Sequence, residues 1–307
     1  MTKINVGLRI PSVESTQPGA IKAYVQHAEA LGFHSIWAGD HVFYHMDVAQ
    51  PLTLLTWVAA LTSRVRLGTS VMLSSYLNPV LIAKAAATLD TLSGGRLTLG
   101  ISTGGTEAEY KSIGIPYDQR TGRLVEMARI MRKLWAEEDG VNYEGRYYTI
   151  ENGNIRPKPV QRPGIPLYFG AASEAMMKRV ARMADGWCAA SGPNIEQFTA
   201  NIARIRGWAA AGGRNPDELG FVKQHNVSID PNPELAKQRA QEHFERYYGP
   251  RFNIASTTTG TLEQVTQELE GFRKAEAPEI TLALESPNLD LGHLEQIARA
   301  TEGLRKT

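Results

Sequence analysis

The sequence predicts an α/β fold in which eight parallel strands, each followed by a helix, close into a (β/α)8 barrel, or TIM barrel. Short apolar runs alternate with longer amphipathic stretches along the chain of 307 residues. The alternation continues past six strands with no break in composition, and one such barrel commonly needs about 250 residues or more. We therefore expect a single domain over residues 1–307. A doubly wound open sheet remains the alternative, because periodicity alone does not show that a sheet closes.

The predicted strands and helices follow one another in a regular order. Apolar runs bounded by turn residues predict strands at Lys3–Ile10, Ser35–Val42, Val65–Leu73, Arg96–Thr103, Pro166–Ser173, Trp187–Ser191, Gly220–Ile229 and Glu279–Leu284. Amphipathic stretches predict helices at Gly19–Leu31, Leu52–Ser63, Pro79–Leu92, Arg123–Glu138, Ser173–Ala184, Ile195–Ala211, Pro233–Tyr248, Leu262–Ala275 and Gly292–Gly303. Two helices carry start signals, since Asn78 precedes a first-turn proline and Ser173 precedes Glu174.

Two segments interrupt this order. Gly140–Pro163 is rich in Tyr, Gly and Pro, which predicts a hairpin followed by a long surface loop. Gly249–Gly260 is expected to be a mobile loop over the barrel mouth. We expect short insertions at the carboxyl-end face of the strands, and we expect these two segments, with the entry around Phe43–Asp47, to select the substrate.

Charge and cysteine content exclude several classes of partner. The net charge is +1, from 33 basic and 32 acidic residues spread along the chain, so we expect neither nucleic acid nor a membrane as a partner. Cys188 is the only cysteine, which excludes an intramolecular disulfide and a cysteine metal cage. His41 and His45 have no supporting ligand cluster, so no metal is expected. The amino terminus lacks the apolar run of a signal peptide, which predicts a cytoplasmic location.

Polar side chains at the strand ends matter most, because the active site of such a barrel lies there. The second strand ends in Asp40 and His41, a carboxylate and a group that titrates near neutral pH, and this pair is suited to proton transfer. Alternatively, Asp40 caps a turn and His41 packs under a loop. In the third strand Gly68, Thr69 and Ser70 interrupt a buried run. This pattern predicts either a bulge where the backbone approaches a flat ligand or a simple bend.

Three further strand ends carry weaker signals. The fourth strand ends in the glycine and hydroxyl residues of Gly100–Thr106, which expose backbone N–H groups. The fifth ends in Gly170–Ser173 and leads directly into a helix, an arrangement that favours an anion, although an ordinary capped helix has the same pattern. Glu285 follows the eighth strand and either faces the barrel mouth or is a solvated loop carboxylate.

Longer motifs join these strand ends into one pattern. They are AEALGFHSIWAGDHV, RVRLGTSVMLSSYLNPVLIAKAAATLDTLSGGRLTLGISTGG, RPKPVQRPGIPLYFGAAS and VARMADGW. On these motifs, together with Ser112–Trp135, the chain resembles the luciferase-like monooxygenase superfamily, particularly its branch of oxidoreductases that use the deazaflavin coenzyme F-420. The resemblance spans about Lys3 to Cys188, and Leu92–Leu97 (LSGGRL) is its most specific part. The rest of the chain resembles the family only loosely.

The resemblance implies an enzyme that transfers a hydride between the deazaflavin and a small organic substrate stacked on the ring at the barrel mouth. A non-prolyl cis peptide, which would fall at Ser70-Val71, would press on the ring. His41 would be the catalytic proton donor or acceptor, and Asp40 would contact the ring or its 8-hydroxy side. Thr103 and Gly104 would approach the ring or its ribityl chain. The cofactor contacts implied in this way are Asp40, Ser70, Val71, Thr103, Gly104, Gly170, Ala171, Ala172 and Ser173, the last four at the phosphate of the tail.

The sequence leaves several alternatives open. Some deazaflavin dehydrogenases have a glutamate directly after the Thr-Gly of the fourth strand, where this chain has Gly105, and a catalytic part for Glu107 or Glu285 stays open. The nearest rival is an FMN-dependent monooxygenase of the bacterial luciferase type, for which a separate reductase would supply reduced flavin. A metal-dependent barrel hydrolase and a non-catalytic flavin-binding barrel are further alternatives. The family often forms dimers, so a homodimer is expected.

Overall fold

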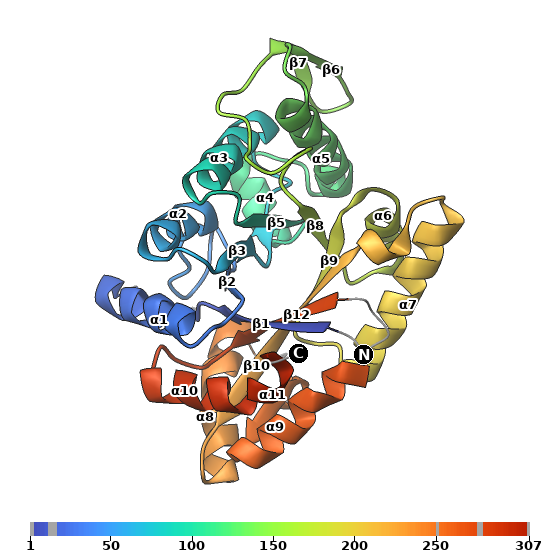
Figure 1. Ribbon diagram of the computed structural model, residues 1–307. Coiled ribbons are helices and arrows are strands. Elements are labelled where there is room, and N and C mark those ends of the chain that lie inside the picture. The colour runs from blue at the N-terminus through green and yellow to red at the C-terminus, as the bar shows by residue number, and fades with distance from the viewer. Residues whose placement is uncertain (1–2, 12–16, 250–251, 275–278, 306–307) are drawn as a thin grey trace.

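The computed structural model describes residues 3–11, 17–249, 252–274 and 279–305, and its core is a closed parallel barrel. Around the ring, each strand pairs in parallel with the next, and the last pairs with the first (Figure 1). The strands of the ring are β1 (Lys3–Arg9), β2 (Ser35–Ala38), β3 (Arg66–Thr69), β5 (Leu97–Ser102), β8 (Leu167–Gly170), β9 (Gly186–Ala189), β10 (Gly220–Ile229) and β12 (Glu279–Glu285). The predicted strands are confirmed, and the open-sheet alternative is wrong because β12 pairs with both β10 and β1.

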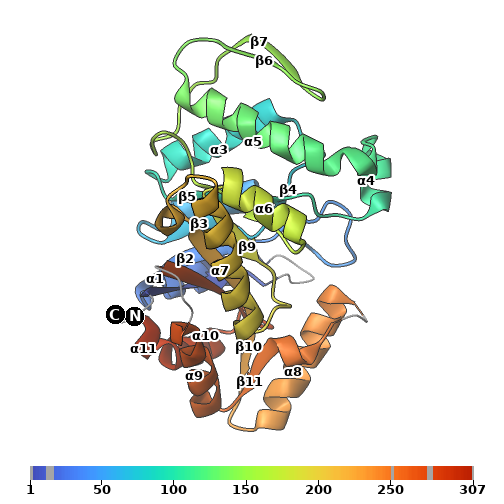
Figure 2. The ribbon, with the colours of Figure 1, turned by 90° about the vertical axis from the view of Figure 1, so that its right-hand side faces the viewer.

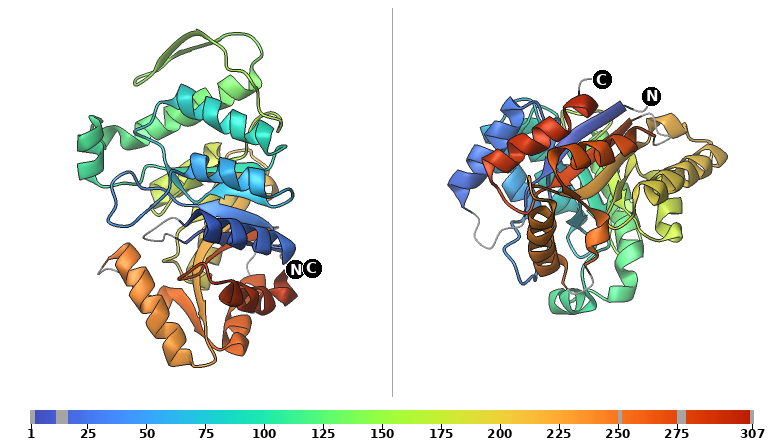
Figure 3. Two further views of the ribbon diagram at one scale, coloured as in Figure 1. Left: turned by 90° about the vertical axis from the view of Figure 1, so that its left-hand side faces the viewer. Right: turned by 90° about the horizontal axis from the view of Figure 1, so that it is seen from below.

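Helices surround the barrel and bury their apolar faces on the outer side of the strands (Figure 1). They are α1 (Pro18–Ala30), α2 (Pro51–Leu61), α3 (Pro79–Leu92), α5 (Arg120–Ala136), α6 (Glu174–Met183), α7 (Ile195–Ala211), α8 (Pro233–Tyr248), α9 (Leu262–Glu270), α10 (Leu291–Ala300) and α11 (Glu302–Arg305). Both predicted start signals are confirmed, since Asn78 accepts from Val80 N at 2.9 Å and Ser173 accepts from Met176 N. The described chain begins and ends at one face, where α11 packs beside β1 (Figure 3).

Two aromatic side chains inside the barrel pack against glycines. Trp37 and Tyr168 belong to an inner cluster with Cys188 and Val222, separate from the outer core under the helices. A Cβ atom on Gly7 would lie 3.0 Å from Trp37 Nε1, one on Gly68 would overlap the Trp37 ring, and Cβ atoms on Gly186 and Gly220 would collide with the ring of Tyr168. Glycines on four strands therefore provide the space that the two rings occupy.

This packing predicts the effect of a methyl group at Gly68. Gly68→Ala is expected to lower the free energy of unfolding by about 1–3 kcal/mol, because the added carbon overlaps a ring that cannot move within the closed barrel. Gly207→Ala is the matched control, since Gly207 lies on the exposed face of α7 with open space around it. There the same change is expected to stabilise the protein by up to about 1 kcal/mol. Chemical unfolding of both variants tests the prediction, and equal effects would contradict it.

Most of the additional segments lie at the carboxyl ends of the strands. The loop of residues 39–50 follows β2, and α4 (Glu107–Ile113) with the 3-10 helix η1 (Tyr117–Gln119) follows β5. After β10 the chain forms α8, the 3-10 helix η3 (Ile254–Ser256) and β11 (Thr257–Gly260). The expected loop at Gly249–Gly260 is therefore partly wrong. Thr257–Gly260 is a strand that pairs with the second half of β10, and residues 250–251 lie outside the described residues.

The predicted hairpin is confirmed, but its place corrects the expectation that it lies at the barrel mouth. It consists of β6 (Val141–Glu144) and β7 (Thr149–Gly153), which pair antiparallel. Because the hairpin joins the end of α5 to the start of β8, it lies on the side of the barrel where the strands begin. The Glu126 carboxylate of α5 accepts from the backbone N–H groups of Arg146 and Tyr147 and holds the hairpin along that helix (Figure 2). The hairpin is thus not part of the wall of the mouth.

Candidate functional site

A cavity of about 370 Å³ opens at the carboxyl ends of the strands. Its wall includes every cofactor-binding residue predicted from the sequence except Asp40, which is hydrogen-bonded to Leu73, two residues after Val71. The residues that line it are Ser70, Val71, Ser102, Thr103, Gly104, Gly170, Ala171, Ala172, Ser173, Met176, Cys188, Ala189, Ala190 and Gln224. Residues from the third, fourth and fifth barrel strands meet here because parallel strands all end at the same face. Whether a ligand contacts each of them stays a prediction.

One wall is the interrupted third strand. The peptide bond Ser70-Val71 is cis, and it separates β3 from β4 (Met72–Leu73), which pairs with β5. Ser70 N donates to the carbonyl of Ala38 at 2.8 Å. The predicted non-prolyl cis bond is therefore present at the predicted position. Ser70 and Val71 both line the cavity, so a polar and an apolar residue lie next to each other in this wall.

Asp40 connects the end of β2 to this wall. Its Oδ2 accepts from Leu73 N at 2.9 Å, and its side chain is buried. Burial raises the pKa of Asp40 to about 6, the Leu73 N–H opposes this shift, and the nearby Glu109 adds to it. Asp40 therefore changes charge close to neutral pH while holding β4 in place.

The raised pKa predicts that Asp40 makes stability depend on pH. The folded chain holds this proton more tightly than the unfolded chain, so the neutral carboxyl stabilises the fold below about pH 4, and this contribution is lost as the pH rises through 6. The shift corresponds to about 3 kcal/mol. The free energy of unfolding of the wild type is therefore expected to fall by about this amount, relative to Asp40→Asn, between pH 4 and pH 8. Asp47→Asn, at an exposed site on the same loop, serves as the control. A pH-independent difference between wild type and Asp40→Asn would contradict the assignment.

His41 follows Asp40 in the loop after β2 and lies among aromatic side chains. Its ring stacks on Tyr44, with centroids 4.0 Å apart and an angle of 11° between the planes, and meets Tyr247 of α8 edge-on. The side chain is 28% exposed. Burial lowers the pKa of His41, and the negative charge of Glu109 opposes that shift. His41 is therefore largely neutral near pH 7, as a proton acceptor must be.

Glu109 is the residue at this site that strand-end reasoning missed. Its Oε1 lies 3.9 Å from His41 Nδ1, too long for a hydrogen bond but close enough for attraction, and it is 3.4 Å from Phe43 N. Its Oε2 accepts from Thr106 N at 2.6 Å in the capping box of α4. The sequence signal was that capping box, which indicates a helix start but not a partner for His41. Glu107, the other open candidate, is exposed.

The walls at β5 and β8 consist largely of small residues. Tyr110 of α4 donates its hydroxyl to the carbonyl of Thr103 at 2.6 Å and fixes the end of β5. A Cβ on Gly104 would collide with Leu73, and one on Gly170 would lie 3.1 Å from Ser102 Cβ. Glycine at these two positions thus lets the strand ends pack closely against Leu73 and Ser102. Ser173, at its far end, caps α6. Burial raises the pKa of the Cys188 thiol in the cavity wall to about 12, so it is a neutral group there.

A buried ion pair lies behind the cavity. Arg9 and Glu285 stand opposite each other on β1 and β12, and their side chains are 4% and 0% exposed. Arg9 also donates to the hydroxyl of Tyr247 at 3.2 Å, and a Cβ on Gly39 would collide with its guanidinium. Of the two alternatives left open for Glu285, the solvated loop carboxylate is therefore wrong. Glu285 is the last residue of β12 and is paired inside the barrel.

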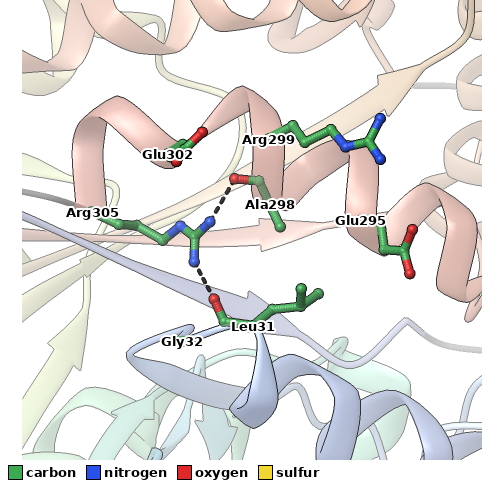
Figure 4. A pocket seen from close by; sticks show the side chains of 7 residues that line it. All are labelled: Leu31, Gly32, Glu295, Ala298, Arg299, Glu302 and Arg305. Atoms are coloured by element: carbon green, nitrogen blue, oxygen red, sulfur yellow. Dashed lines mark hydrogen bonds between the residues drawn. The ribbon is translucent and has the colours of Figure 1, made fainter.

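A larger hollow, of about 510 Å³, lies at the opposite end of the barrel, where the loop from α1 enters β2 (Figure 4). Arg305 donates to the carbonyl of Leu31 and to that of Ala298, so it ties the ends of α1 and α10 together. These hydrogen bonds satisfy backbone carbonyls near the ends of two helices. The hollow lies at the end of the barrel opposite to Asp40 and His41. The hollow is larger than the cavity at the strand ends, but chemistry in such barrels takes place at the carboxyl ends.

Metal-ligating side chains and apolar helices bear on the expected partners. Among residues 3–11, 17–249, 252–274 and 279–305, three or more His, Cys, Asp or Glu side chains nowhere gather in a way that could hold a metal ion. Over the same ranges, every helix is too short or too polar to cross a bilayer.

Comparisons with known proteins agree with the fold and the motifs. The model of the luciferase-like monooxygenase family matches residues 5–304. A protein of Kineococcus radiotolerans described as an F420-dependent glucose-6-phosphate dehydrogenase is 34% identical over 239 residues, which are 75% of this chain and 70% of that protein.

Two solved structures have the same fold. The monooxygenase RslO1 from Streptomyces bottropensis superimposes with a TM-score of 0.82 at 24% identity, over 97% of this chain and 98% of that one. An F420-dependent secondary alcohol dehydrogenase, in complex with an F420-acetone adduct, does so with a TM-score of 0.83 at 20% identity, over 99% and 98%. The resemblance drawn from the motifs is confirmed: this chain belongs to the luciferase-like monooxygenase family.

Proposed function

We propose that this chain is an oxidoreductase that transfers a hydride between coenzyme F-420 and a small organic substrate at the barrel mouth. The observation that carries the proposal is the cavity at the strand ends, bordered by Asp40 and formed by Ser70, Val71, Thr103, Gly104 and Gly170–Ser173. The cofactor is supported by relatives more than 30% identical that are described as F420-dependent glucose-6-phosphate dehydrogenases.

The residues of the cavity fit a flat ring with an anionic tail. The walls at β5 and β8 are formed by Thr103, Gly104 and Gly170–Ser173, whose short or absent side chains admit a flat group between them. The chain Gly170–Ser173 leads into the amino end of α6, where backbone N–H groups and the helix dipole favour a phosphate. We infer that Ser70 and Val71 support one face of the ring and that Asp40 binds its edge.

When bound, a deazaflavin supplies a central carbon that takes up or gives back a hydride. A substrate carbon that gives up a hydride leaves its attached oxygen or nitrogen with a proton to lose, and we assign this proton to neutral His41. The Glu109 carboxylate favours a proton on Nδ1, which leaves Nε2 as the basic atom. Tyr44 holds the plane of the ring by stacking.

This arrangement predicts a shift in the pH dependence when Glu109 is neutralised. Glu109 raises the pKa of His41, so Glu109→Gln is expected to lower it and to move the acid limb of kcat/KM to lower pH. The exposed Glu107→Gln on the same helix should leave the limb in place. An unchanged limb in Glu109→Gln, measured with F-420 and a substrate that is turned over, would contradict the pairing.

The alternatives are less well supported. An FMN-dependent monooxygenase has the same fold, but several relatives above 30% identity are described as F420-dependent. A barrel hydrolase needs a metal site, and within the part of the chain that the structure describes no cluster has enough ligands. A non-catalytic barrel would bind the cofactor tightly without turnover. The single domain, the homodimer, the cytoplasmic location and a separate reductase stay predictions, and sedimentation of the purified chain tests the dimer.

Titration of the purified protein with oxidised and reduced F-420 and FMN tests the proposal. We expect F-420 to bind more tightly than FMN, and we expect a substrate panel that includes glucose 6-phosphate to identify a compound that reduces the bound cofactor. Micromolar binding of FMN without binding of F-420 would overturn the assignment. Stoichiometric metal in the purified protein would instead favour the hydrolase.

A further inference from the structure

Gln224 is a polar side chain of the cavity wall whose contacts fix its orientation. It lies on β10 and lines the cavity beside Ala190 and Cys188. Its Nε2 donates to the hydroxyl of Tyr248 at 2.8 Å and to Glu285 Oε2 at 3.3 Å. These two acceptors come from α8 and β12, so three elements of the fold meet at one amide.

The chemistry of these partners determines which end of the amide faces the ligand. An ionised carboxylate only accepts hydrogen bonds, so the nitrogen of the amide must be the atom that faces Glu285. Both hydrogens of Nε2 are then used, one by Glu285 and one by Tyr248. Oε1 is therefore the end of the amide that can meet a ligand in the cavity.

The buried ion pair keeps this orientation in place. Glu285 is 0% exposed and is held by Arg9, and Arg9 is held in turn by Tyr247. Rotation of the Gln224 amide by half a turn would direct its carbonyl oxygen at the Glu285 carboxylate, which is repulsive at low dielectric. The pair thus acts on the cavity through Gln224 without lining the cavity itself.

We propose that Gln224 is a further cofactor-binding residue, whose Oε1 accepts a hydrogen bond from the ring N–H of the pyrimidine edge. This inference rests on the proposed function, since it requires a deazaflavin ring in the cavity. The pyrimidine half of such a ring has one N–H between two carbonyl groups, and an acceptor fixed in position satisfies that donor. Glu285 and Tyr248 are positioning residues for Gln224. The hydrogen bond then sets the direction of the ring, with its pyrimidine edge toward β10.

The test measures the affinity of oxidised F-420 for wild type and Gln224→Met by quenching of cofactor fluorescence. Met has nearly the same length as Gln, but its thioether sulfur is only a weak acceptor for the ring N–H. Loss of the bond and burial of an unpaired donor are expected to weaken binding roughly tenfold or more. Gln238→Met, on the exposed side of α8, is the matched control and should bind as the wild type does.

A ring analogue methylated at the pyrimidine N–H gives a second measurement that does not depend on the folding of a variant. The wild type is expected to bind the parent deazaflavin roughly tenfold or more tightly than the methylated one, and Gln224→Met to show a ratio near one. Equal ratios in the two proteins, or a wild type indifferent to the methyl group, would overturn the inference. Failure of the wild type to bind F-420 at all would instead overturn the proposed function on which the inference rests.

Discussion

Replacement of His41 by alanine is expected to lower turnover by roughly 10²- to 10⁴-fold while the affinity for F-420 stays close to that of the wild type. The ring of His41 stacks on Tyr44 and faces Glu109, and it is not among the residues that line the cavity. Its loss should therefore remove a proton acceptor without removing a cofactor contact. Fluorescence titration measures the affinity, and steady-state kinetics with F-420 measures turnover.

The chain offers a matched control four residues further on. His45 lies on the same loop, and its ring contacts the carbonyl of Arg246 at the end of α8. His45→Ala therefore disturbs the loop without removing the proton acceptor, and it should reduce turnover far less than His41→Ala. Unchanged turnover in His41→Ala, or equal losses in the two variants, would refute the catalytic role of His41.

The largest expected effect on stability is at Arg9 and Glu285. Arg9→Met leaves a carboxylate without its partner inside the barrel, and Glu285→Met leaves a guanidinium without one. Each is expected to lower the free energy of unfolding by about 3–5 kcal/mol, because a buried charge without a partner is far from water. The double variant Arg9→Met/Glu285→Met should recover much of this loss, since it removes both charges.

An exposed pair serves as the comparison. Lys133 of α5 is paired with Glu137, the residue that follows this helix, and their side chains are 45% and 42% exposed. Lys133→Met is expected to cost about 0–1 kcal/mol, because water screens the charges. Chemical unfolding of the single and double variants measures all these values. If Arg9→Met cost no more than Lys133→Met, burial of the Arg9–Glu285 pair would not make either charge depend on its partner.

Sequence reasoning predicted the barrel and most of the cavity because both depend on local patterns. Each strand is an apolar run of its own, and parallel strands all end at one face, so the strand-end residues Ser70, Thr103 and Gly170 meet in the cavity without any knowledge of distances. The small residues at those strand ends could also be recognised in the sequence, because they directly follow the apolar run of each strand.

The missed features depend on contacts between distant segments. Arg9 and Glu285 are 276 positions apart, and nothing in either neighbourhood indicates the other. Glu109 completes the capping box of α4, and this local role is enough to explain an acidic residue at this position. Nothing in the sequence therefore indicates that its carboxylate lies near His41. Thr257–Gly260 has no alternation of apolar and polar residues, and it is a strand only because the long edge of β10 extends beyond β9.

The central claim is that a deazaflavin lies in the cavity at the strand ends, and a crystal structure of the chain with oxidised F-420 tests it most directly. We predict a ring supported by Ser70 and Val71, a tail phosphate at Gly170–Ser173, and His41 facing the central carbon of the ring. A cofactor bound elsewhere, for example in the hollow around Arg305, or one whose tail points away from α6, would contradict the account.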